Sequence, residues 1–350
     1  MKRLVLTFAG AAAAGSVLLY FAIGLYETGA LRAVDPYFKG DCRPIGPIAG
    51  AEDLEFSDKH DLYFISSDHR PENMGEQTPN GNIYSLSRDG NELKQLADSM
   101  PFEFHPHGLS LLEEGNRTLV WVVNHRPEET TIEVFTYADG KLAHLKTFEN
   151  ELLGNANDIA AYSLDRFFVT RDHQTDSHRA ARIYDYLRIG NGSVVSFNGK
   201  SYDTRATGLA FANGIISTAD GSRLIVAEMM RQRLHIYRVE NESGELSKEK
   251  TIPLGSSPDN VTWDADGNLW IGTHPNLLKL SAHSRDHKRP SPSVVLRLKG
   301  PLSEDSRPEE IFRDDGSHLS AVSVAKRVGP NLVLGTVFDS KLSFCTIASP

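Results

Sequence analysis

Beyond about residue 50, the chain is dominated by short apolar or alternating runs that are separated by polar turns. Leu62 to Ser67 is followed by Asn82 to Leu86, and Leu119 to His125 is followed by Ile132 to Tyr137. Runs of this length that are rich in Val, Ile, Tyr and Phe are typical of β-strands. Each pair therefore predicts two neighbouring strands of one small antiparallel sheet.

The same pattern continues to the C-terminus and gives six units in all. The later units begin with the runs Arg166 to Thr170, Arg223 to Glu228, Asn268 to Thr273 and Asn331 to Thr336. Turn sequences lie between the runs, at Asp89-Gly90, Asp139-Gly140, Asp220-Gly221 and Asp266-Gly267. Degenerate strand repeats of about 40 to 50 residues are typical of propellers. We therefore predict an all-β, six-bladed β-propeller whose first and last segments share one blade, with a β-sandwich as the alternative fold.

The N-terminal segment differs sharply from this pattern. Lys2 and Arg3 precede an uncharged run from Leu4 to Leu25, which as a helix would be about 33 Å long, enough to cross a bilayer. The small residues from Ala11 to Ser16 offer a cleavage region, so the segment is either a retained anchor or a cleaved signal. Both interpretations place the rest of the chain outside the cytosol.

These two patterns divide the chain into two parts. Residues 1–30 are the N-terminal signal-anchor or uncleaved signal segment, a hydrophobic helix, and residues 31–350 are the propeller domain. Within the propeller, His178 to Leu187 is the best candidate for a helix, and we expect it to form a lid.

Composition excludes some functions. With 40% hydrophobic and 24% charged residues, the chain of 350 residues has the composition of a soluble globular protein. A formal net charge of -9 argues against a general affinity for nucleic acid and mildly favours the binding of cations.

Export determines how the two cysteines are interpreted. Cys42 and Cys345 lie near opposite ends of the exported part, and an even number of cysteines in an oxidising compartment predicts one disulfide bond. Closing so long a loop should stabilise the protein by about 4 to 5 kcal/mol in the chain-entropy model. Export also makes Asn116, Asn191 and Asn241 candidate glycosylation sites, because each begins an Asn-X-Ser/Thr sequence.

Familiar catalytic motifs are absent from the sequence: there is no G-x-S-x-G nucleophile elbow and no H-E-x-x-H zinc helix. What remains is a set of oxygen donors and histidines where predicted strands begin or end. These are Glu52-Asp53, His107, His125, Asn157-Asp158, Asp172-His173, Asn213, Asp259-Asn260 and His274. Innermost propeller strands all start at one end of the tunnel, so these residues would converge there. Because neighbouring side chains of a strand point to opposite faces, a pair such as Asn157-Asp158 could serve two stacked hard cations.

The order and spacing of these short sequences resemble the paraoxonase family of serum arylesterases and lactonases, from about residue 30 to the C-terminus. The matching sequences are Gly50 to Glu55, Phe104 to Gly108, Val122 to His125, Asn157 to Ile159, Phe211 to Ile215, Pro258 to Asn260, Gly272 to Asn276 and Gly335 to Phe338. The two cysteines and the hydrophobic N-terminus also fit the family pattern.

The resemblance implies two calcium ions in the tunnel of a six-bladed propeller. By position, the catalytic ion would be held by Glu52, Asn157, Asn213, Asp259 and Asn260. The structural ion would be held by Asp53, Asp158 and the backbone carbonyl of Leu109. Two carboxylates and three neutral amides formally balance a dication, so the catalytic ion would remain a useful Lewis acid.

The resemblance also assigns roles to the histidines. His107 and His125 would form a dyad in which His107 activates water and His125 orients or recharges it. His105, two positions from His107, lies outside the family's catalytic position and is interpreted as a packing or rim residue. Asp172 matches an acid behind the ligands, and His274 matches a residue of the pocket wall.

Two features depart from the family. Thr273 stands where vertebrate members carry a free cysteine, which should not affect hydrolysis. The loop of residues 68–79 and the lid region of residues 177–207 hardly match, which leaves the substrate range open.

The sequence therefore predicts a secreted or membrane-anchored, calcium-dependent hydrolase that opens lactones and cleaves aryl esters. Its partners would be a small lactone or ester and, through the N-terminal segment, a membrane or lipid surface. Direct attack by the carboxylate of Asp259 is an alternative to attack by water. A gluconolactonase-like propeller with a single metal ion and a propeller kept as a non-catalytic binding scaffold are the alternative functions.

Overall fold

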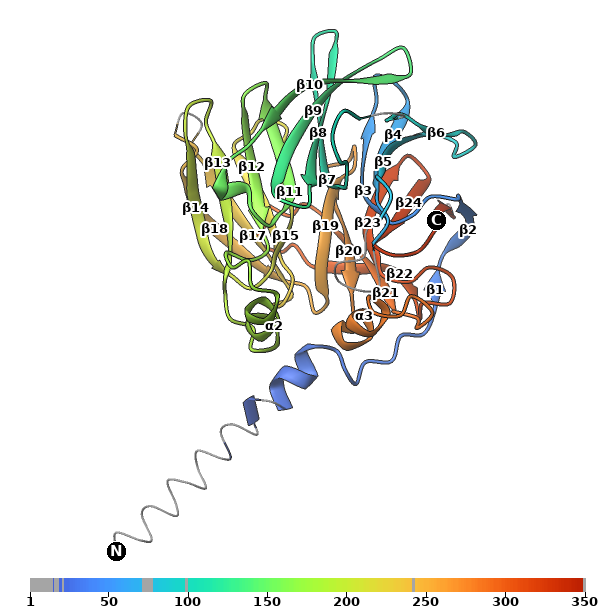
Figure 1. The fold of residues 1–350 in the computed structure, drawn as a ribbon. Helices are drawn as coiled ribbons and strands as arrows, with labels where there is room; N and C mark the ends of the chain where they lie inside the picture. Colours follow the sequence, from blue (N-terminus) through green and yellow to red (C-terminus); the bar gives the residue numbers. More distant parts are fainter. Residues whose placement is uncertain are drawn as a thin grey trace, which may run out of the picture.

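The structure, a computed structural model, describes residues 15, 19–20, 22–70, 78–97, 100–240 and 243–348. The strands of these residues form six antiparallel sheets around a central axis (Figure 1). The arrangement confirms the predicted six-bladed β-propeller and rules out the sandwich.

The first four blades each use four consecutive strands, with the first strand innermost. The first blade contains β3 (Ala51–Ser57), β4 (Leu62–Ser67), β5 (Asn82–Ser87) and β6 (Leu93–Gln95). The second contains β7 (Pro106–Glu114), β8 (Arg117–His125), β9 (Thr130–Ala138) and β10 (Lys141–Phe148). The third contains β11 (Ala156–Ser163), β12 (Arg166–Arg171), β13 (Gly192–Phe197) and β14 (Tyr202–Leu209). The fourth contains β15 (Ala212–Ser217), β16 (Arg223–Glu228), β17 (Arg233–Val239) and β18 (Leu246–Pro253).

The last two blades recruit strands from the N-terminal side of the domain. The fifth contains β19 (Ser257–Trp263), β20 (Leu269–His274), β21 (Ser293–Leu298) and β22 (Pro308–Asp314), and β1 (Tyr37–Phe38) pairs with β22 at its edge. The sixth contains β23 (Val322–Val328), β24 (Asn331–Thr336) and β25 (Leu342–Ile347), and β2 (Gly40–Ile45) completes it. The ring thus closes within one blade, as the sequence predicted.

A disulfide bond joins the two strands that close the ring. Cys42 of β2 lies directly opposite Cys345 of β25, and the two sulfur atoms are bonded across a sequence separation of 303 residues. The predicted bridge is therefore confirmed, and it ties β2, the outermost strand of the sixth blade, to β25, the last strand in the sequence.

The apolar core lies between the blades rather than at the axis. The described residues contain six buried apolar clusters, and each joins the facing sheets of two neighbouring blades. For example, Trp121 of β8 stacks on Phe148 of β10 at a centroid distance of 5.5 Å, and both contact Phe167 of the third blade. Because the large apolar side chains pack at these interfaces, buried polar side chains can gather at the axis where the innermost strands begin.

The turns follow the sequence prediction. Gly90, Gly140, Gly221 and Gly267 all have positive φ angles, between 67° and 76°. Only glycine adopts such angles readily, which explains the recurring Asp-Gly turns.

Among the described residues between the strands, there are two helices and a short 3-10 helix: α2 (His178–Tyr186), α3 (Leu277–His283) and η1 (Glu151–Leu153). The helix predicted at residues 178–187 is therefore present. α2 follows β12 and α3 follows β20, so both lie at the end of the tunnel where the innermost strands begin. The described part of the N-terminal segment, which is helical at residues 22–27, runs beside the same two helices (Figure 1).

Several contacts hold the N-terminal segment at this end. The Glu27 carboxylate pairs with Arg188 just beyond α2, and the backbone carbonyl of Thr28 accepts a hydrogen bond of 2.9 Å from the N–H of Leu277 at the start of α3. The Tyr20 hydroxyl donates to the carbonyl of Leu187. Most of the apolar run from Leu4 to Leu25 lies outside the described residues, and within them no helix is both long and apolar enough to cross a bilayer.

The candidate glycosylation sites differ in exposure. Asn116 is exposed in the turn between β7 and β8, whereas Asn191 is partly buried and its side-chain oxygen accepts a hydrogen bond from the backbone of Gln174. Asn241 lies outside the described residues.

His173 connects α2 to the third blade. Its Nε2 lies 2.9 Å from Asp185 in α2, and its Nδ1 lies 3.3 Å from Asp172, which follows β12. Burial opposes the charged form, but the hydrogen bonds to Asp172 and Asp185 outweigh burial and raise the pKa of His173 to about 9. The imidazolium therefore bridges two carboxylates at neutral pH.

This bridge predicts a pH dependence of stability. The pKa of His173 is higher in the folded protein, so its contribution is full below the unfolded value of about 6.5 and is lost as the pH rises through about 9. We expect the wild-type protein to lose more unfolding free energy between pH 6.5 and pH 10 than His173→Gln does. Urea titrations at both pH values measure this difference, and equal losses in the two proteins would contradict the bridge.

The disulfide bond makes a second prediction. Replacing both Cys42 and Cys345 by Ala should lower the free energy of unfolding by about 4 kcal/mol, because the loop in the unfolded chain is no longer constrained. The fold should persist, since β2 and β25 remain paired over six residue positions, from Gly40↔Ile347 to Ile45↔Leu342. Denaturant titration of the variant beside the oxidised parent gives the value, and an unchanged midpoint would refute the stabilising role.

Candidate active site

All six innermost strands break their pairing with the next strand at one level of the tunnel. The register shifts at Ala51/Asp53, Pro106/Leu109, Ala156/Ile159, Ala212/Ile215, Pro258/Val261 and Val322/Val324. The residues left out of the ladders are Glu52, His107, Gly108, Asn157, Asp158, Asn213, Gly214, Asp259, Asn260 and Ser323. β-Bulges of this kind bend a strand and re-aim its side chains. The breaks thus collect most of the predicted site residues around the axis.

The pair Asn157-Asp158 shows how the breaks separate two levels. In a regular inner strand, alternation would send neighbouring side chains toward the two adjacent blades, which is not the geometry that two ions stacked along the axis require. Both residues instead fall within the break between Ala156 and Ile159. Alternation along a strand is therefore not sufficient to explain the pair, and the break is the feature that frees both side chains.

The five residues predicted to hold the catalytic ion form the upper donor set: Glu52, Asn157, Asn213, Asp259 and Asn260. All five are at most 5% exposed. Four of their oxygens, Glu52 Oε2 and the side-chain oxygens of the three asparagines, are buried and accept no hydrogen bond from the residues that the structure describes. A buried polar atom left without a partner costs about 1 to 3 kcal/mol. Four such oxygens in one donor set fit a hard cation, because calcium prefers carboxylate and carbonyl oxygens.

Hydrogen bonds to Glu52 fix part of this set. The amide nitrogen of Asn260 donates to Glu52 Oε1 at 2.7 Å, which leaves the amide oxygen of Asn260 as the free atom. The Ser323 hydroxyl donates to the backbone carbonyl of Glu52 at 2.6 Å. Sequence reasoning missed Ser323, because a single serine in a buried strand carries no pattern of its own.

His274 lies directly behind Asp259. Its Nε2 is 2.7 Å from the Asp259 carboxylate, and its ring is only 1% exposed. Burial raises the pKa of Asp259, while the hydrogen bond and the charge of His274 act in the opposite direction. The residue predicted for the pocket wall therefore orients a member of the upper donor set.

Asp53 and Asp158 form the lower carboxylate pair. Asp53 accepts hydrogen bonds of 2.8 Å from the backbone N–H groups of Leu54 and Leu109, and Asp158 accepts bonds of 2.7 Å from those of Ile159 and Ile215. Each aspartate thus ties its own strand to the innermost strand of the next blade. Burial, followed by the charges of Asp158 and Glu52, raises the pKa of Asp53 well above its usual range. Burial likewise raises the pKa of Asp158 well above its usual range.

Burial disfavours two negative charges so close together, so the pair would otherwise keep a proton. A bound cation could take the place of that proton. The backbone N–H of Leu109 is seen at this pair, and the role predicted for its carbonyl oxygen stays a prediction. Within the described residues, no group of three or more His, Cys, Asp and Glu side chains could hold a metal ion. The upper donor set is of a different kind, because three of its five members are amides.

Glycine permits the close approach of the inner strands. A Cβ atom on Gly108 would lie 2.3 Å from Asp158 Oδ1, and one on Gly214 would lie 2.5 Å from the backbone oxygen of Asp259. Neither position has room for a side chain, so each glycine allows its strand to reach the neighbouring strand at the level of the donors.

His107 and His125 are hydrogen-bonded to each other beside the upper donor set. His107 Nδ1 lies 2.8 Å from His125 Nε2, and His107 Nε2 lies 3.5 Å from Glu52 Oε1. His125 Nδ1 lies 3.2 Å from the hydroxyl of Thr130. Burial, followed by the nearby His107, lowers the pKa of His125 well below its usual value, so that this ring is neutral at pH 7. The chain Thr130–His125–His107 therefore leads to Glu52.

The other predicted residues lie outside this group. His105 faces Asp68 at 3.1 Å, and the same carboxylate lies 3.4 Å from Arg70, whose buried Nε has no hydrogen-bond partner. Asp172 lies beside His173, which also contacts Asp185 of α2, and the predicted role of Asp172 behind the ligands stays a prediction. Thr273, which stands where vertebrate members of the family carry a cysteine, is buried. Its hydroxyl donates a hydrogen bond of 2.8 Å to the carbonyl of Val294, which is a structural role.

Comparison with solved structures agrees on the fold. A luciferin-regenerating enzyme superposes with a TM-score of 0.56 at 13% identity, covering 89% of this chain and 95% of that chain. A protein described as a putative gluconolactonase gives 0.54 at 12% identity, covering 88% and 92%. At these identities the similarity shows the propeller fold alone.

Sequence comparison is more specific. A family model described as Arylesterase matches residues 76–347. Serum paraoxonase/arylesterase 1 of Homo sapiens is 32% identical over 337 residues, which cover 92% of this chain and 94% of that protein. Serum paraoxonase/lactonase 3 of Homo sapiens is 30% identical over 361 residues, which cover 99% of each. The serum paraoxonases are therefore relatives of this chain, and the chain belongs to the arylesterase family.

Proposed function

We propose that this protein is a calcium-dependent hydrolase that opens lactones and cleaves aryl esters. The observation that carries the proposal is the set of four buried oxygens without partners, which lies beside a hydrogen-bonded pair of histidines. Relatives named arylesterase and lactonase support the same class of substrates.

Glu52, Asn157, Asn213, Asp259 and Asn260 would hold the catalytic calcium. When bound, the ion would supply a Lewis acid for the carbonyl oxygen of the ester, where negative charge develops. The protein's part is to hold the donors in place before the substrate arrives. Asn260 does so through its hydrogen bond to Glu52, and Asp259 is held by His274.

His107 would act as the general base. Because His125 is neutral, its Nε2 can accept the Nδ1–H of His107, while its own Nδ1–H donates to Thr130. This arrangement leaves the lone pair of His107 Nε2 on the side of Glu52, where it can take a proton from water. Attack of that water on the ester carbon would then expel an alkoxide or phenoxide, which takes the proton from His107. The products would be a carboxylic acid and an alcohol or phenol, or a hydroxy acid from a lactone.

Asp53, Asp158 and the carbonyl of Leu109 would hold a second, structural calcium. Their carboxylates tie neighbouring blades together at the axis, so neutralising their charge would stabilise the ring. Two levels of donors distinguish this proposal from the alternative of a single metal ion.

We also propose an extracellular or lumenal location, with residues 1–30 as the signal or anchor and 31–350 as the catalytic domain. The described part of the N-terminal segment lies at the α2 and α3 end of the tunnel. Tyr26 and Leu31 in this segment and Tyr186 in α2 are more than 60% exposed, which supports contact with a lipid surface. α2 would serve as a lid at this end.

Hydrolysis of phenyl acetate and of a six-membered lactone tests the activity. We expect both reactions in the presence of calcium and their loss after treatment with a chelator. His107→Gln should lower kcat by about 10²- to 10⁴-fold, because the general base is removed. The matched control is His105→Gln, which changes a histidine two positions away and should retain most of the activity.

Activity that is indifferent to the chelator, or a His107→Gln variant as active as the wild type, would disprove the proposed mechanism. Elemental analysis of the purified protein distinguishes the alternative of one metal. We expect two calcium ions per chain, whereas the gluconolactonase-like alternative requires one.

The neighbours Asn157 and Asp158 should fail in different ways. Asn157→Ala removes an oxygen that accepts no hydrogen bond, so it should reduce activity at least tenfold with little change in thermal stability. Asp158→Ala leaves the buried N–H groups of Ile159 and Ile215 without their acceptor, which costs about 1 to 3 kcal/mol for each group. Thermal unfolding and initial rates of both variants give the comparison, and purely catalytic, equal losses would contradict the two levels.

A further inference from the structure

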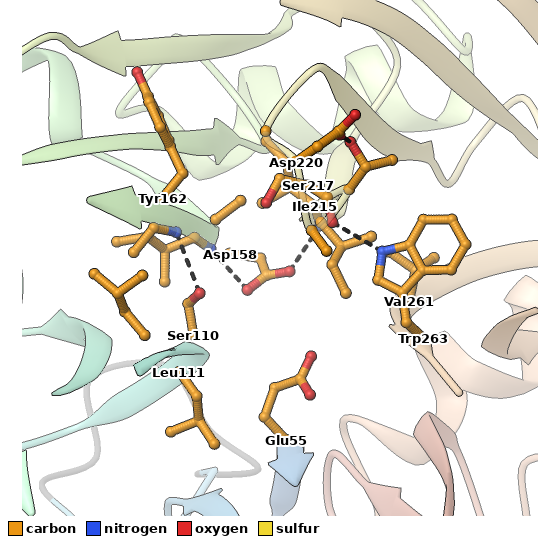
Figure 2. Close-up of a pocket in the computed structure, with 18 of the residues that line it drawn as sticks. Glu55, Ser110, Leu111, Asp158, Tyr162, Ile215, Ser217, Asp220, Val261 and Trp263 are labelled. Carbon is orange, nitrogen blue, oxygen red and sulfur yellow. Dashed lines mark hydrogen bonds between the residues drawn. The ribbon is translucent and has the colours of Figure 1, made fainter. Parts of the chain in front are cut away.

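A large cavity opens at the end of the tunnel opposite the two histidines. Its volume is about 1030 Å³, and the turns that follow the innermost strands line its mouth. Figure 2 shows the carboxylates of Asp158 and Glu55 facing the same open space, with Leu111, Val261 and Trp263 around it.

The two levels of donors differ in their relation to this cavity. Asp53, Asp158 and Leu109, the residues of the lower carboxylate pair and its predicted carbonyl ligand, all line it. None of the described residues that line it belongs to the upper donor set. Along β3, Glu52 faces the histidine end, Asp53 comes next, and Glu55 lies further toward the cavity. A cation that entered past the histidines would therefore meet the upper donors first.

The charges of the lining favour the passage of cations. Six carboxylates line the described part of the cavity, at Asp53, Glu55, Glu113, Asp158, Asp220 and Asp264, against one basic residue, Arg166. Lys326 pairs with Glu55 at 2.5 Å and Arg327 pairs with Asp264 at 3.2 Å, whereas Glu113 and Asp220 accept hydrogen bonds from hydroxyl groups. With Glu55 and Asp264 paired, four carboxylates remain against one arginine in the described lining. A cleft with such an excess of negative charge and apolar walls concentrates cations and speeds their entry.

We propose that this cavity is the entry and exchange route for the lower divalent cation, separate from the mouth that receives the substrate. The inference rests on the proposed function, because it assumes two bound ions. It assigns Glu55 a role that neither the sequence pattern nor the donor set indicates, because its carboxylate faces the same open space as that of Asp158. The lower ion can then exchange while substrate occupies the other end.

Three copies of one turn sequence allow a matched test. Ala219-Asp220-Gly221 and Ala265-Asp266-Gly267 both lie at the mouth of the cavity, whereas Ala138-Asp139-Gly140 forms the outer turn between β9 and β10. All three alanines are exposed. Both native cysteines are in the disulfide bond, so a cysteine introduced by Ala219→Cys is the only thiol that can be labelled.

The experiment attaches a small trimethylammonium-bearing thiol reagent to the folded, calcium-loaded Ala219→Cys protein. The rate at which bound calcium exchanges with radioactive calcium is measured before and after labelling, at low ionic strength. We expect one of the two ions to exchange on the order of threefold more slowly, because a fixed positive charge at the mouth repels the dication. Labelling Ala219→Cys instead with a sulfonate-bearing reagent of similar size should not slow the exchange, because its charge is negative.

Two controls locate the effect. The same cationic label on Ala138→Cys should leave both exchange rates unchanged, and the hydrolysis of phenyl acetate should be unaffected in every labelled protein. Asn213→Ala identifies the upper ion, since that ion should be the one released faster in this variant.

The outcomes separate the two proposals. Two bound ions that both exchange at their unlabelled rates, or that are both slowed to the same extent, would overturn the route while leaving the proposed function intact. A single bound ion per chain would overturn the two-ion arrangement and the route with it.

Discussion

The break in pairing that all six innermost strands share is the constraint on which the rest of the site depends. A strand in a regular ladder directs its side chains toward the two neighbouring blades, where the apolar clusters lie. Where the ladder is interrupted, side chains and backbone groups are released toward the axis. Because the six breaks lie at one level, residues from Glu52 to Ser323 meet there although 271 positions separate them.

Closure of the ring follows from the same geometry. Six interfaces between blades bury the large apolar side chains, and polar groups gather at the axis where the innermost strands begin. There they must find partners among themselves or in a ligand. Asp53 and Asp158 find theirs in the backbone N–H groups of the adjacent blades, and Ser323 finds its partner in the carbonyl of Glu52. Within the described residues, four oxygens of the upper donor set have no such partner. These four atoms lie together where a cation and an ester would bind.

The two ends of the tunnel have different chemistry. At one end lie the two histidines, the helices α2 and α3 and the described N-terminal residues, with Arg188 paired to Glu27. At the other end the lining is acidic and the cavity is open. Placing the structural carboxylates next to the open acidic end, and the catalytic donors next to the histidines, would allow one protein to keep two ions with separate functions.

Much of this could be predicted from the sequence, because alternation and Asp-Gly turns are local properties. The six repeats, the turns, the helix at residues 178–187 and the pairing of Cys42 with Cys345 follow from patterns within short segments or from a count of cysteines. The residues of the two donor levels could be predicted because most of them stand in short sequences that match the pattern of the paraoxonase family. Ser323 could not be predicted, because a single serine in a buried strand has no local pattern that reports its neighbours. Tertiary structure alone decided that the ladders break at one level, that Asp53 and Asp158 bridge neighbouring blades, and that a cavity reaches only the lower pair. These properties arise from contacts between strands that are distant in sequence, and such contacts exist only once the ring has closed.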